Sequence, residues 1–473
     1  MQLPLTPALS PGEIPLDGHV LRGEREPRHG MPSGTPMDAL RVGIIGLGTV
    51  GASVARILQE QAARMTLRSG REIRLTRAAV RDLTRSRGVD LPASALTTDP
   101  LAVATAPDVD VVVELMGGLK PSREVVLAAL QSGKDVVTAN KALLCEHGGE
   151  LFRAAREAGR CIAFEAAVAG GVPIIHTLGQ AMTANQITAI EAILNGTSNF
   201  ILTEMFQKEA AYSDAVALAQ ELGFAEADPT MDVKGTDAAQ KLGLLALLAF
   251  GTRVTPDQFL VQGIDTIELT DLVYADELGY AVKLLATARL VNGKLEMHTQ
   301  PTLIRGDRPI AQTDGPCNII GLTGDIVGTT WYSGFGAGGM PTASAVVSDI
   351  IDVAAGRARM NFERLDLWGA HAPFPLQPVE EIHRRYYLRF HVEDRAHVMA
   401  EITDALGSHG ISLASVIQHE TPEPEESPTP GPKFVPLVIM THRTSEGELR
   451  AASAALTKLG CIRTPWVCMP ISD

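Results

Sequence analysis

After the first 40 residues, apolar positions follow the pattern of a strand and then that of a helix. From residue 41 the sequence RVGIIGLGTVGASVARIL passes from a short β-branched run, through a glycine turn, to apolar residues at helical spacing. Further apolar runs predict strands at 73–80, 110–115, 134–138 and 161–167, and helices near 122–132 and 146–158. Strands that alternate with helices indicate an α/β fold with a Rossmann-type, doubly wound parallel sheet, which we expect over 41–170.

The pattern changes in the next part of the chain, where helical spacing dominates. The run QITAIEAIL at 186–194 predicts a strand, and helices are predicted at 197–209, 213–222 and 232–250. A glycine-rich loop, GFGAGGMPTASAVVSDI, then leads into a further helix. We expect a second α/β domain over 171–370, whose C-terminal part returns to the first domain.

The C-terminal part has the pattern of a small separate module. A proline-rich linker, 371–382, contains APFPLQP and marks a boundary. Beyond it the pattern predicts strand 386–392, helix 397–410, strand 411–420, strand 434–443, helix 446–460 and strand 466–472. This βαββαβ order predicts a ferredoxin-like domain over 383–473. The acidic, Pro-rich TPEPEESPTPGPK is expected to be a solvated loop within it.

Composition and charge narrow the classes of function. The chain has 473 residues, 45% hydrophobic and 20% charged, which suits an enzyme of two or three domains. A net charge of −14 argues against a nucleic-acid or membrane-surface partner and favours a small-molecule substrate. The longest apolar run, LGLLALLAFG at 242–251, has about half of the residues that a membrane span needs and predicts a buried helix.

Cysteine usage and the N-terminal segment bear on location. The five cysteines form no CxxC pair and lie apart from one another, which fits a reducing cytoplasm. Residues 1–40 are rich in Pro, Gly and charge and lack the apolar core of a signal peptide. We expect them to form a flexible extension.

The turn after the first predicted strand has the pattern of a dinucleotide site. Gly46, Gly48 and Gly51 form a GxGxxG, and Thr49 and Val50 lie between the last two glycines. The first glycine allows a tight turn, the second lets a pyrophosphate approach the backbone, and the third lets the helix pack on the strand. Because the motif joins a strand to a helix, we favour the dinucleotide over a merely structural turn.

The end of the second predicted strand bears on the choice between NADP and NAD. Arg81 suits the 2′-phosphate of NADP, whereas Asp82 could grip the ribose hydroxyls of NAD. The alternative is that both are solvated residues of a turn. We expect NADP and keep NAD possible.

An acidic segment with a lysine lies beside the apolar run. Asp237 and Lys241 are four residues apart and share one helix face. Such a pair is usually a surface salt bridge. A helix as apolar as 242–251 must be largely buried, however, and its charges then need a cleft or a partner.

These motifs together resemble the homoserine dehydrogenase family, in its bacterial form with a C-terminal ACT domain. The resemblance covers about 41–473 and rests on GLGTVG (46–51), VVTANKALL (136–144), EAAVAGGVPII (165–175), LNGTSNFIL (194–202), GFAEADPTMDVKGTDAAQKL (223–242) and GAGGMPTASAVVSDI (336–350). It implies reversible NAD(P)H-dependent reduction of L-aspartate 4-semialdehyde to L-homoserine, in the biosynthesis of threonine, methionine and isoleucine. We expect the form without a fused aspartokinase.

The resemblance also implies residue roles. Lys241 would be the acid/base or alkoxide-stabilising group, with Lys141 as the other candidate. Substrate binding would fall to Glu226, Asp232 and Asp237, with a contribution from Thr197. The cofactor would contact Gly46, Gly48, Thr49, Val50, Gly51, Arg81, Met116, Lys141 and Gly338. Backbone carbonyls of Glu165, Val168, Gly170 and Val172 would bind a monovalent cation, sodium, although a plain Gly-rich turn predicts the same residues.

The terminal module resembles an amino-acid sensor. VEDRAHVMAEITDALGSHGISLASVIQ at 392–418 is similar to the ACT pattern, which implies feedback control by L-threonine. The family usually has glycine at the position of His397, and a histidine side chain there can obstruct the approach of a ligand. The family resemblance further implies a homodimer or homotetramer.

Two other functions fit parts of the pattern. A related two-domain dehydrogenase that acts on aspartate or another semialdehyde would not need the acid-rich segment 226–241. A catalytically silent amino-acid sensor would not need both Lys141 and Lys241. Both features therefore favour the homoserine dehydrogenase interpretation.

Overall fold

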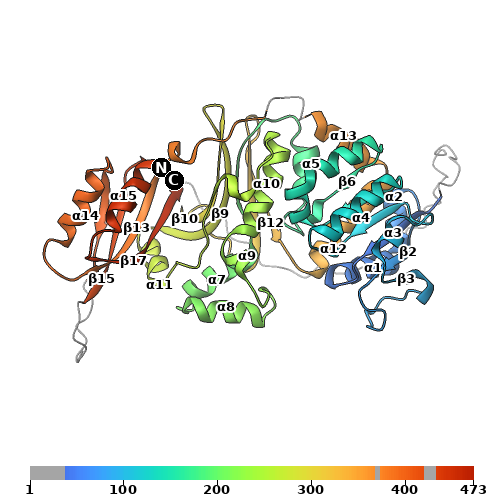
Figure 1. Cartoon of the computed structure of the whole chain (residues 1–473), viewed down its shortest axis with the longest axis horizontal. Helices are drawn as coiled ribbons and strands as arrows, with labels where there is room; N and C mark the ends of the chain where they lie inside the picture. Colours follow the sequence, from blue (N-terminus) through green and yellow to red (C-terminus); the bar gives the residue numbers. More distant parts are fainter. Residues whose placement is uncertain (1–37, 368–372, 420–432, 473) are drawn as a thin grey trace, which may run out of the picture. The chain divides into compact units, whose positions relative to one another are not determined.

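Apolar, β-branched strands form a parallel sheet against which helices pack (Figure 1). This computed structural model describes residues 38–367, 373–419 and 433–472. Six strands lie in the order β3-β2-β1-β4-β5-β6, and every neighbouring pair is parallel. They are β1 Leu40–Ile45, β2 Ile73–Ala79, β3 Leu96–Thr97, β4 Val111–Glu114, β5 Asp135–Thr138 and β6 Ile162–Ala163. The predicted Rossmann-type sheet is confirmed.

The helices that accompany this sheet are α1 Thr49–Glu60, α2 Ala62–Ser69, α3 Pro100–Ala104, α4 Lys120–Gln131 and α5 Lys141–Glu157. Side-chain caps mark the start of two of them, α3 and α5. Asp99 caps α3 by accepting a hydrogen bond from the Leu101 amide at 2.9 Å, and Asn140 caps α5 through the Leu143 amide at 3.1 Å. The strand predicted at 161–167 is shorter than expected, because a 3-10 turn follows it at Glu165–Ala167.

A mixed sheet of 11 strands forms the remainder, in the order β12-β11-β7-β9-β10-β17-β13-β15-β14. Its first part contains β7 Ile187–Ile193, β8 Leu260–Val261, β9 Tyr280–Val291, β10 Lys294–Arg305, β11 Cys317–Gly324 and β12 Gly328–Phe335. Only β7 was predicted. The turn between β9 and β10 is Asn292-Gly293, both with positive φ, which is the geometry that a two-residue hairpin favours.

Further helices lie between β6 and β13 along the chain. They are α6 Ile174–His176, α7 Gly196–Gln207, α8 Tyr212–Glu221, α9 Thr230–Val233, α10 Thr236–Phe250, α11 Leu269–Glu277, α12 Gly339–Ala354 and α13 Arg357–Leu367. Of these, α7, α10 and α11 pack on β9 of the mixed sheet, whereas α12 and α13 contact strands of the first sheet (Figure 1). The single helix predicted at 232–250 is interrupted at Gly235, which has φ +80°. The apolar run lies on α10 and is largely buried, as expected. Helix α12 packs against α1, so the glycine-rich loop before it returns to the first sheet.

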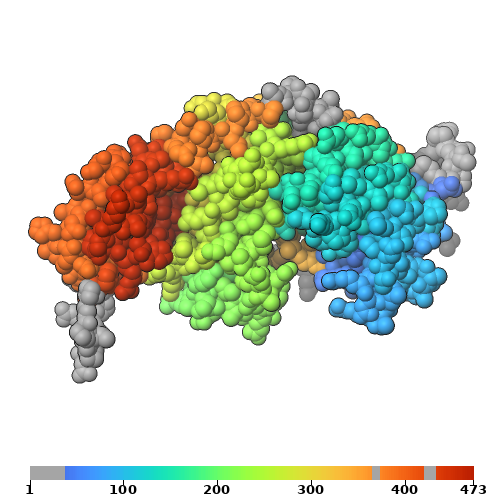
Figure 2. All heavy atoms as spheres, viewed as in Figure 1, coloured from blue at the N-terminus to red at the C-terminus, as the bar shows by residue number. Residues whose placement is uncertain are grey.

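The C-terminal module has the predicted βαββαβ order. Its elements are β13 His383–Glu393, α14 Val398–Gly407, β14 Leu413–Ile417, β15 Phe434–Thr441, β16 Thr444–Ser445, α15 Glu446–Leu456 and β17 Ile462–Ser472. Strand β17 pairs in parallel with β10, so the module continues the preceding sheet. In the space-filling view the module, orange to red, lies against the yellow and green part of the chain (Figure 2). No described helix is long and apolar enough to cross a membrane.

Three predicted segments lie partly outside the described residues. The extension at 1–40 is described only from residue 38, and the linker 371–382 only from residue 373. Of the acidic, Pro-rich loop only Lys433 is described.

Candidate active site

One carboxylate joins two lysines from distant parts of the chain. Asp237, in the first turn of α10, accepts a hydrogen bond from Lys241 Nζ at 2.7 Å through Oδ2, and Lys141 Nζ lies 3.1 Å from Oδ1. Asp237 is only 7% exposed. The i,i+4 pair that spacing alone marked as a surface salt bridge is therefore a buried one, and it extends to a third group.

Burial and charge act in opposite directions on this carboxylate. Burial would raise the pKa of Asp237, but the positive charges of Lys241 and Lys141 and the hydrogen bonds from Lys241 and Asn195 hold it below its ordinary value. The carboxylate is therefore ionised at neutral pH. Lys241 Nζ donates a second hydrogen bond to the carbonyl oxygen of Leu194, at 2.8 Å.

Asn195, which the sequence did not single out, organises the acids. Its Oδ1 accepts from the Ser198 amide at 2.7 Å and so caps α7, while Nδ2 donates to Asp232 at 2.6 Å and to Asp237 at 2.9 Å. Burial raises the pKa of Asp232 against the effect of the Asn195 hydrogen bond. A single asparagine has no spacing pattern, and its only sequence signal is its place before a helix.

Lys141 lies at the carboxyl end of the parallel sheet, where open α/β sheets bind ligands. It is the first residue of α5, directly after the cap Asn140, whose Nδ2 donates to the Gly118 carbonyl at 2.8 Å. Glu114, a fully buried carboxylate, fixes the neighbouring loop that follows β4. Glu114 accepts from the Met116 amide at 3.1 Å and from Thr138 Oγ1 at 2.7 Å. The Met116 backbone is thereby held beside the start of α5.

Two substrate-binding candidates lie outside this hydrogen-bonded cluster. Glu226 is exposed, and its carboxylate has no hydrogen bond or ion pair among the described residues. Thr197 is buried and its hydroxyl donates to the Phe224 carbonyl at 2.7 Å. Asp237 thus contacts the two lysines directly and Asp232 is linked to them through Asn195, whereas Thr197 fixes the loop that carries Glu226.

The glycine motif forms an open cradle at the start of α1. A Cβ on Gly51 would collide with the carbonyl oxygen of Gly46, whereas one on Gly48 would meet no atom within 4 Å. The cap residue Gly48 offers no side chain to the first-turn amides, which leaves them for an anion. The loop that ends at Gly338 lies alongside, because a Cβ on the next residue, Gly339, would lie 3.0 Å from Thr49 Cγ2.

Arg81 and Asp82 lie just beyond the end of β2 and are both exposed. Oδ1 of Asp82 accepts from the Thr84 hydroxyl at 2.7 Å and from the Thr84 amide at 2.8 Å. These hydrogen bonds lower the pKa of Asp82. One oxygen of the carboxylate that could grip a ribose is thus engaged within its own turn.

The turn at 165–172 is held from the side by an acid cluster. The Glu165 carboxylate accepts from the amides of Ile175 and His176 at 3.0 and 2.8 Å and pairs with the His176 ring. Burial would lower the pKa of His176, but hydrogen bonds to Asp352 and Glu165 raise it to about 10. No group of three or more His, Cys, Asp or Glu within the described ranges could hold a metal ion. Any cation here would need backbone ligands.

Comparison with known proteins assigns three segments. A family model for homoserine dehydrogenase matches residues 173–351, one for the homoserine dehydrogenase NAD-binding domain matches 46–165, and one for the ACT domain matches 386–461. The chain is 42% identical to the homoserine dehydrogenase of Pseudomonas aeruginosa over 435 residues, which cover 91% of this chain and 98% of that protein.

Solved structures give the same assignment. The homoserine dehydrogenase from Thiobacillus denitrificans has a TM-score of 0.84 and 42% identity, and the match covers 92% of this chain and 99% of that one. A hyperthermophilic archaeal homoserine dehydrogenase, solved in complex with NADPH, has a TM-score of 0.56 and 26% identity and covers 66% of this chain and 97% of that one.

Proposed function

The chain belongs to the homoserine dehydrogenase family, and on this premise we propose that Lys241 is the proton-transfer group of the reaction. The observation that carries the proposal is the buried carboxylate of Asp237, which holds Lys241 and Lys141 together. An ammonium has three N–H groups. Two of those on Lys241 donate to Leu194 and Asp237, which leaves the third for the oxygen of the substrate.

Reduction of an aldehyde develops negative charge on its oxygen, and that oxygen must receive a proton. A cation fixed by a buried carboxylate supplies both the charge and the proton. Lys141 is the alternative donor, with a side chain that is 33% exposed and pairs with the other oxygen of Asp237. Its place at the sheet edge suits a position between cofactor and substrate.

We assign Asp232, Asp237, Glu226 and Thr197 to substrate binding. Glu226 is exposed and uncommitted, so its carboxylate is available to an ammonium group. Asp232 is held by Asn195 beside Asp237. Thr197 acts through the loop, because its hydroxyl is engaged by the Phe224 carbonyl.

The glycine cradle fits a dinucleotide. Gly51 leaves no room for a Cβ, the space beside Gly48 is open, and the first-turn amides of α1 have no side-chain cap. When bound, a nicotinamide cofactor supplies or takes up the hydride. The residues Gly46, Gly48, Thr49, Val50 and Gly51 would hold its phosphates, and Met116, Lys141 and Gly338 would flank it.

We propose NADP as the preferred form of the cofactor. Arg81 presents an exposed guanidinium at the end of β2, and Asp82 is partly engaged by Thr84. Arg remains charged at every working pH and matches phosphate geometry. An archaeal relative in complex with NADPH is consistent with this preference.

We propose a sodium site on backbone carbonyls of the turn at 165–172. The carbonyls are those of Glu165, Val168, Gly170 and Val172. The carbonyls of Val168 and Gly170 accept no hydrogen bond among the described residues. Those of Glu165 and Val172 each accept one backbone amide, at 3.4 and 2.8 Å. The turn can therefore offer oxygen ligands, which a hard monovalent cation prefers.

Regulation by L-threonine through the ACT domain is proposed on the domain's presence and on its continuity with the catalytic sheet. His397 adopts φ +73°, the left-handed conformation that favours glycine.

Replacement of His397 by glycine removes both the backbone strain and the side-chain bulk at this position. We expect His397→Gly to show stronger inhibition by L-threonine than the unaltered chain, in assays at subsaturating homoserine. His397→Ala, which removes bulk but keeps the strain, is the matched control.

The enzyme is further proposed to be a cytoplasmic homodimer or homotetramer. All five cysteines are free in the structure, as a reducing compartment requires.

The decisive test of the activity is an absorbance assay of the NADPH or NADH that forms from L-homoserine, with each cofactor in turn. If neither NADP⁺ nor NAD⁺ is reduced, the result would instead favour a catalytically silent amino-acid sensor.

A further inference from the structure

A cavity of about 340 Å³ lies where the ACT part of the large sheet meets the part that precedes it. One wall comes from β7, β9 and β10 and the other from β13 and β17. No residue of the lysine cluster or the glycine cradle lines it. Its size lies within the range of small-molecule sites, which begins at about 300 Å³.

The lining of this junction cavity is strongly basic. It carries a single carboxylate, Glu191, which pairs with Arg308. The basic side chains that line it are Arg289, Arg308, Arg384, Arg385 and Arg443, together with His298 and His383. In a chain whose net charge is −14, such a concentration of positive charge points to a negatively charged occupant.

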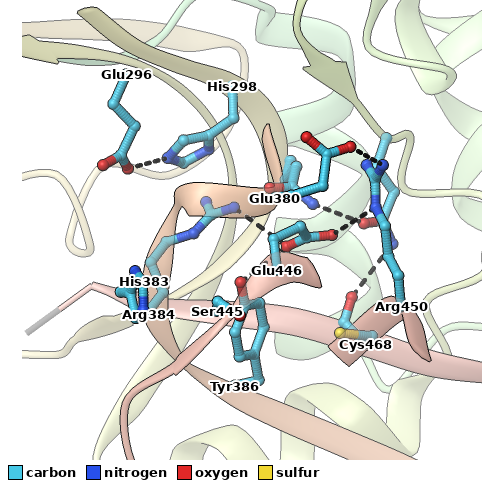
Figure 3. Close-up of polar contacts among 12 residues, drawn as sticks. Glu296, His298, Glu380, His383, Arg384, Tyr386, Ser445, Glu446, Arg450 and Cys468 are labelled. Carbon is cyan, nitrogen blue, oxygen red and sulfur yellow. Dashed lines mark hydrogen bonds and ion pairs between the residues drawn. The ribbon is translucent and has the colours of Figure 1, made fainter. Parts of the chain in front are cut away.

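Arg384 is the unusual member of this set. It is 5% exposed, and none of its three guanidinium nitrogens has a hydrogen-bond partner among the described residues. Its nearest carboxylate is Glu446, 3.5 Å from Nη2, too far for a good hydrogen bond. Glu446 is itself engaged by the Tyr386 hydroxyl at 2.8 Å and by Arg450 at 3.5 Å (Figure 3).

The opposite wall also offers buried nitrogens without partners. His298 is 4% exposed with its Nδ1 unbonded, and Arg289 pairs with Glu296 through Nη2 while its Nε remains unbonded. Figure 3 shows His298 and Glu296 facing the side of the site that carries Arg384. Burial, with the charges of Arg384 and Arg289, holds the pKa of His298 well below its ordinary value, so the imidazole is neutral. It can therefore donate one hydrogen bond without adding charge.

We propose that this junction cavity binds a small molecule through an oxyanion, either a carboxylate or a phosphoryl group, held by Arg384 with help from Arg289 and His298. A buried guanidinium whose N–H groups lack acceptors is costly, and an oxyanion supplies two acceptors in the geometry of its fork. The cavity has room for more than the bare ion. The site differs from the ACT loop at His397 and from the catalytic cluster, so its test is independent of the proposed activity.

The test is thermal unfolding of the full chain, saturated with NADP⁺ to fill the glycine cradle, at constant ionic strength. Inorganic phosphate and malonate are titrated separately, with chloride as the reference anion. We expect a saturable rise in Tm that chloride does not give. The anion with the lower midpoint identifies the phosphoryl or the carboxylate source.

Variants assign the effect to Arg384. Arg384→Met should raise the midpoint of the titration at least about tenfold, which is the loss expected for a charge-assisted pair of hydrogen bonds. Arg450→Gln is the matched control. It removes a positive charge that lies beside the same Glu446, but Arg450 does not line the cavity. It should titrate as the unaltered chain does.

Hydrogen exchange on the unaltered chain keeps the test decisive if Arg384→Met does not fold. Bound anion should protect peptides that contain β10 and the start of β13. The proposal is overturned if neither anion gives a saturable rise, as for a cavity filled only by water, if Arg384→Met responds like Arg450→Gln, or if protection is absent from these peptides.

Discussion

Asp237 positions both neighbouring lysines, because its carboxylate contacts Lys241 through Oδ2 and Lys141 through Oδ1. The sequence gives this only in part. Spacing placed Asp237 and Lys241 on one helix face, and the apolar run implied burial. The contact with Lys141 joins residues 96 positions apart, between two domains, and no local pattern encodes it. The same holds for Asn195 and Glu114, whose roles arise only from packing.

Lys241→Ala should lower turnover about a hundredfold or more, in line with general acid/base contributions, and leave the affinity for NADP⁺ unchanged. Steady-state kinetics and a fluorescence titration of cofactor measure the two effects. Lys234→Ala is the control, since Lys234 lies on the same stretch but pairs with Asp265 at the surface. Near-normal turnover of Lys241→Ala would make the lysine structural.

Arg81 should set cofactor preference. Arg81→Ala removes a charge-assisted contact to the 2′-phosphate, so the Kd for NADP⁺ should rise about 10- to 100-fold while that for NAD⁺ stays constant. Titration of each cofactor measures this. Arg74→Ala, an exposed arginine of β2 paired with Glu72, should change neither. An equal effect on both cofactors would remove Arg81 from the site.

At the level of elements, patterning succeeded where burial is regular and failed where it is not. Strands β1, β4 and β5 are almost fully buried runs of four to six residues rich in Val and Ile, and glycine or a capping residue precedes the helices α1 and α5. The two-residue strand β3 was not predicted. Strand β9 is buried on both faces over 282–288 and contains Ala, Leu and Lys, which favour helices, so neither alternation nor composition revealed it. Strand β10 buries His298, Gln300 and Thr302, which masks its apolar signal.

A buried ion pair links α11 to the ACT strand β13. Asp271 is fully buried and accepts from Arg389 Nε at 2.7 Å and Nη2 at 3.0 Å, and the Tyr387 hydroxyl donates to it at 3.1 Å. Asp271→Ala removes the buried carboxylate and leaves the buried Arg389 with the half-exposed Glu268, 3.1 Å from Nη2, as its carboxylate partner among the described residues. We expect Asp271→Ala to lower the free energy of unfolding by about 3–5 kcal/mol, measured by urea denaturation.

Two controls separate this ion pair from the helix that carries it. Asp276→Ala removes an exposed acid of the same α11 and should cost less than about 0.5 kcal/mol. The double variant Asp271→Leu/Arg389→Met replaces both charges by apolar groups and should recover much of the loss. If Asp271→Ala lowers the free energy of unfolding as little as Asp276→Ala does, the ion pair contributes little to stability.

At the scale of the whole chain, the ACT domain is less separate than its proline-rich linker suggested. Residues 39–473 form one compact unit. Strand β17 pairs with β10, and Tyr387 and Met469 belong to the same apolar cluster as Leu272 and Leu303 of the catalytic part. A linker composition marks where the chain changes direction. It carries no information about which faces then pack together.

This shared core predicts the outcome of removing the ACT domain. A chain ending at residue 376 would expose the edge of β10 and the cluster around Leu272 and Leu303, and each fully buried side chain of this size contributes about 1.5–3 kcal/mol. We expect it to be largely insoluble or to melt well below the full chain, measured by soluble yield and by circular dichroism. Loss of threonine inhibition after such a deletion would then report unfolding, so the effector site must be tested by the His397 variants in the full chain. A truncated chain that melts cooperatively near the Tm of the full chain and keeps its turnover would contradict the shared core.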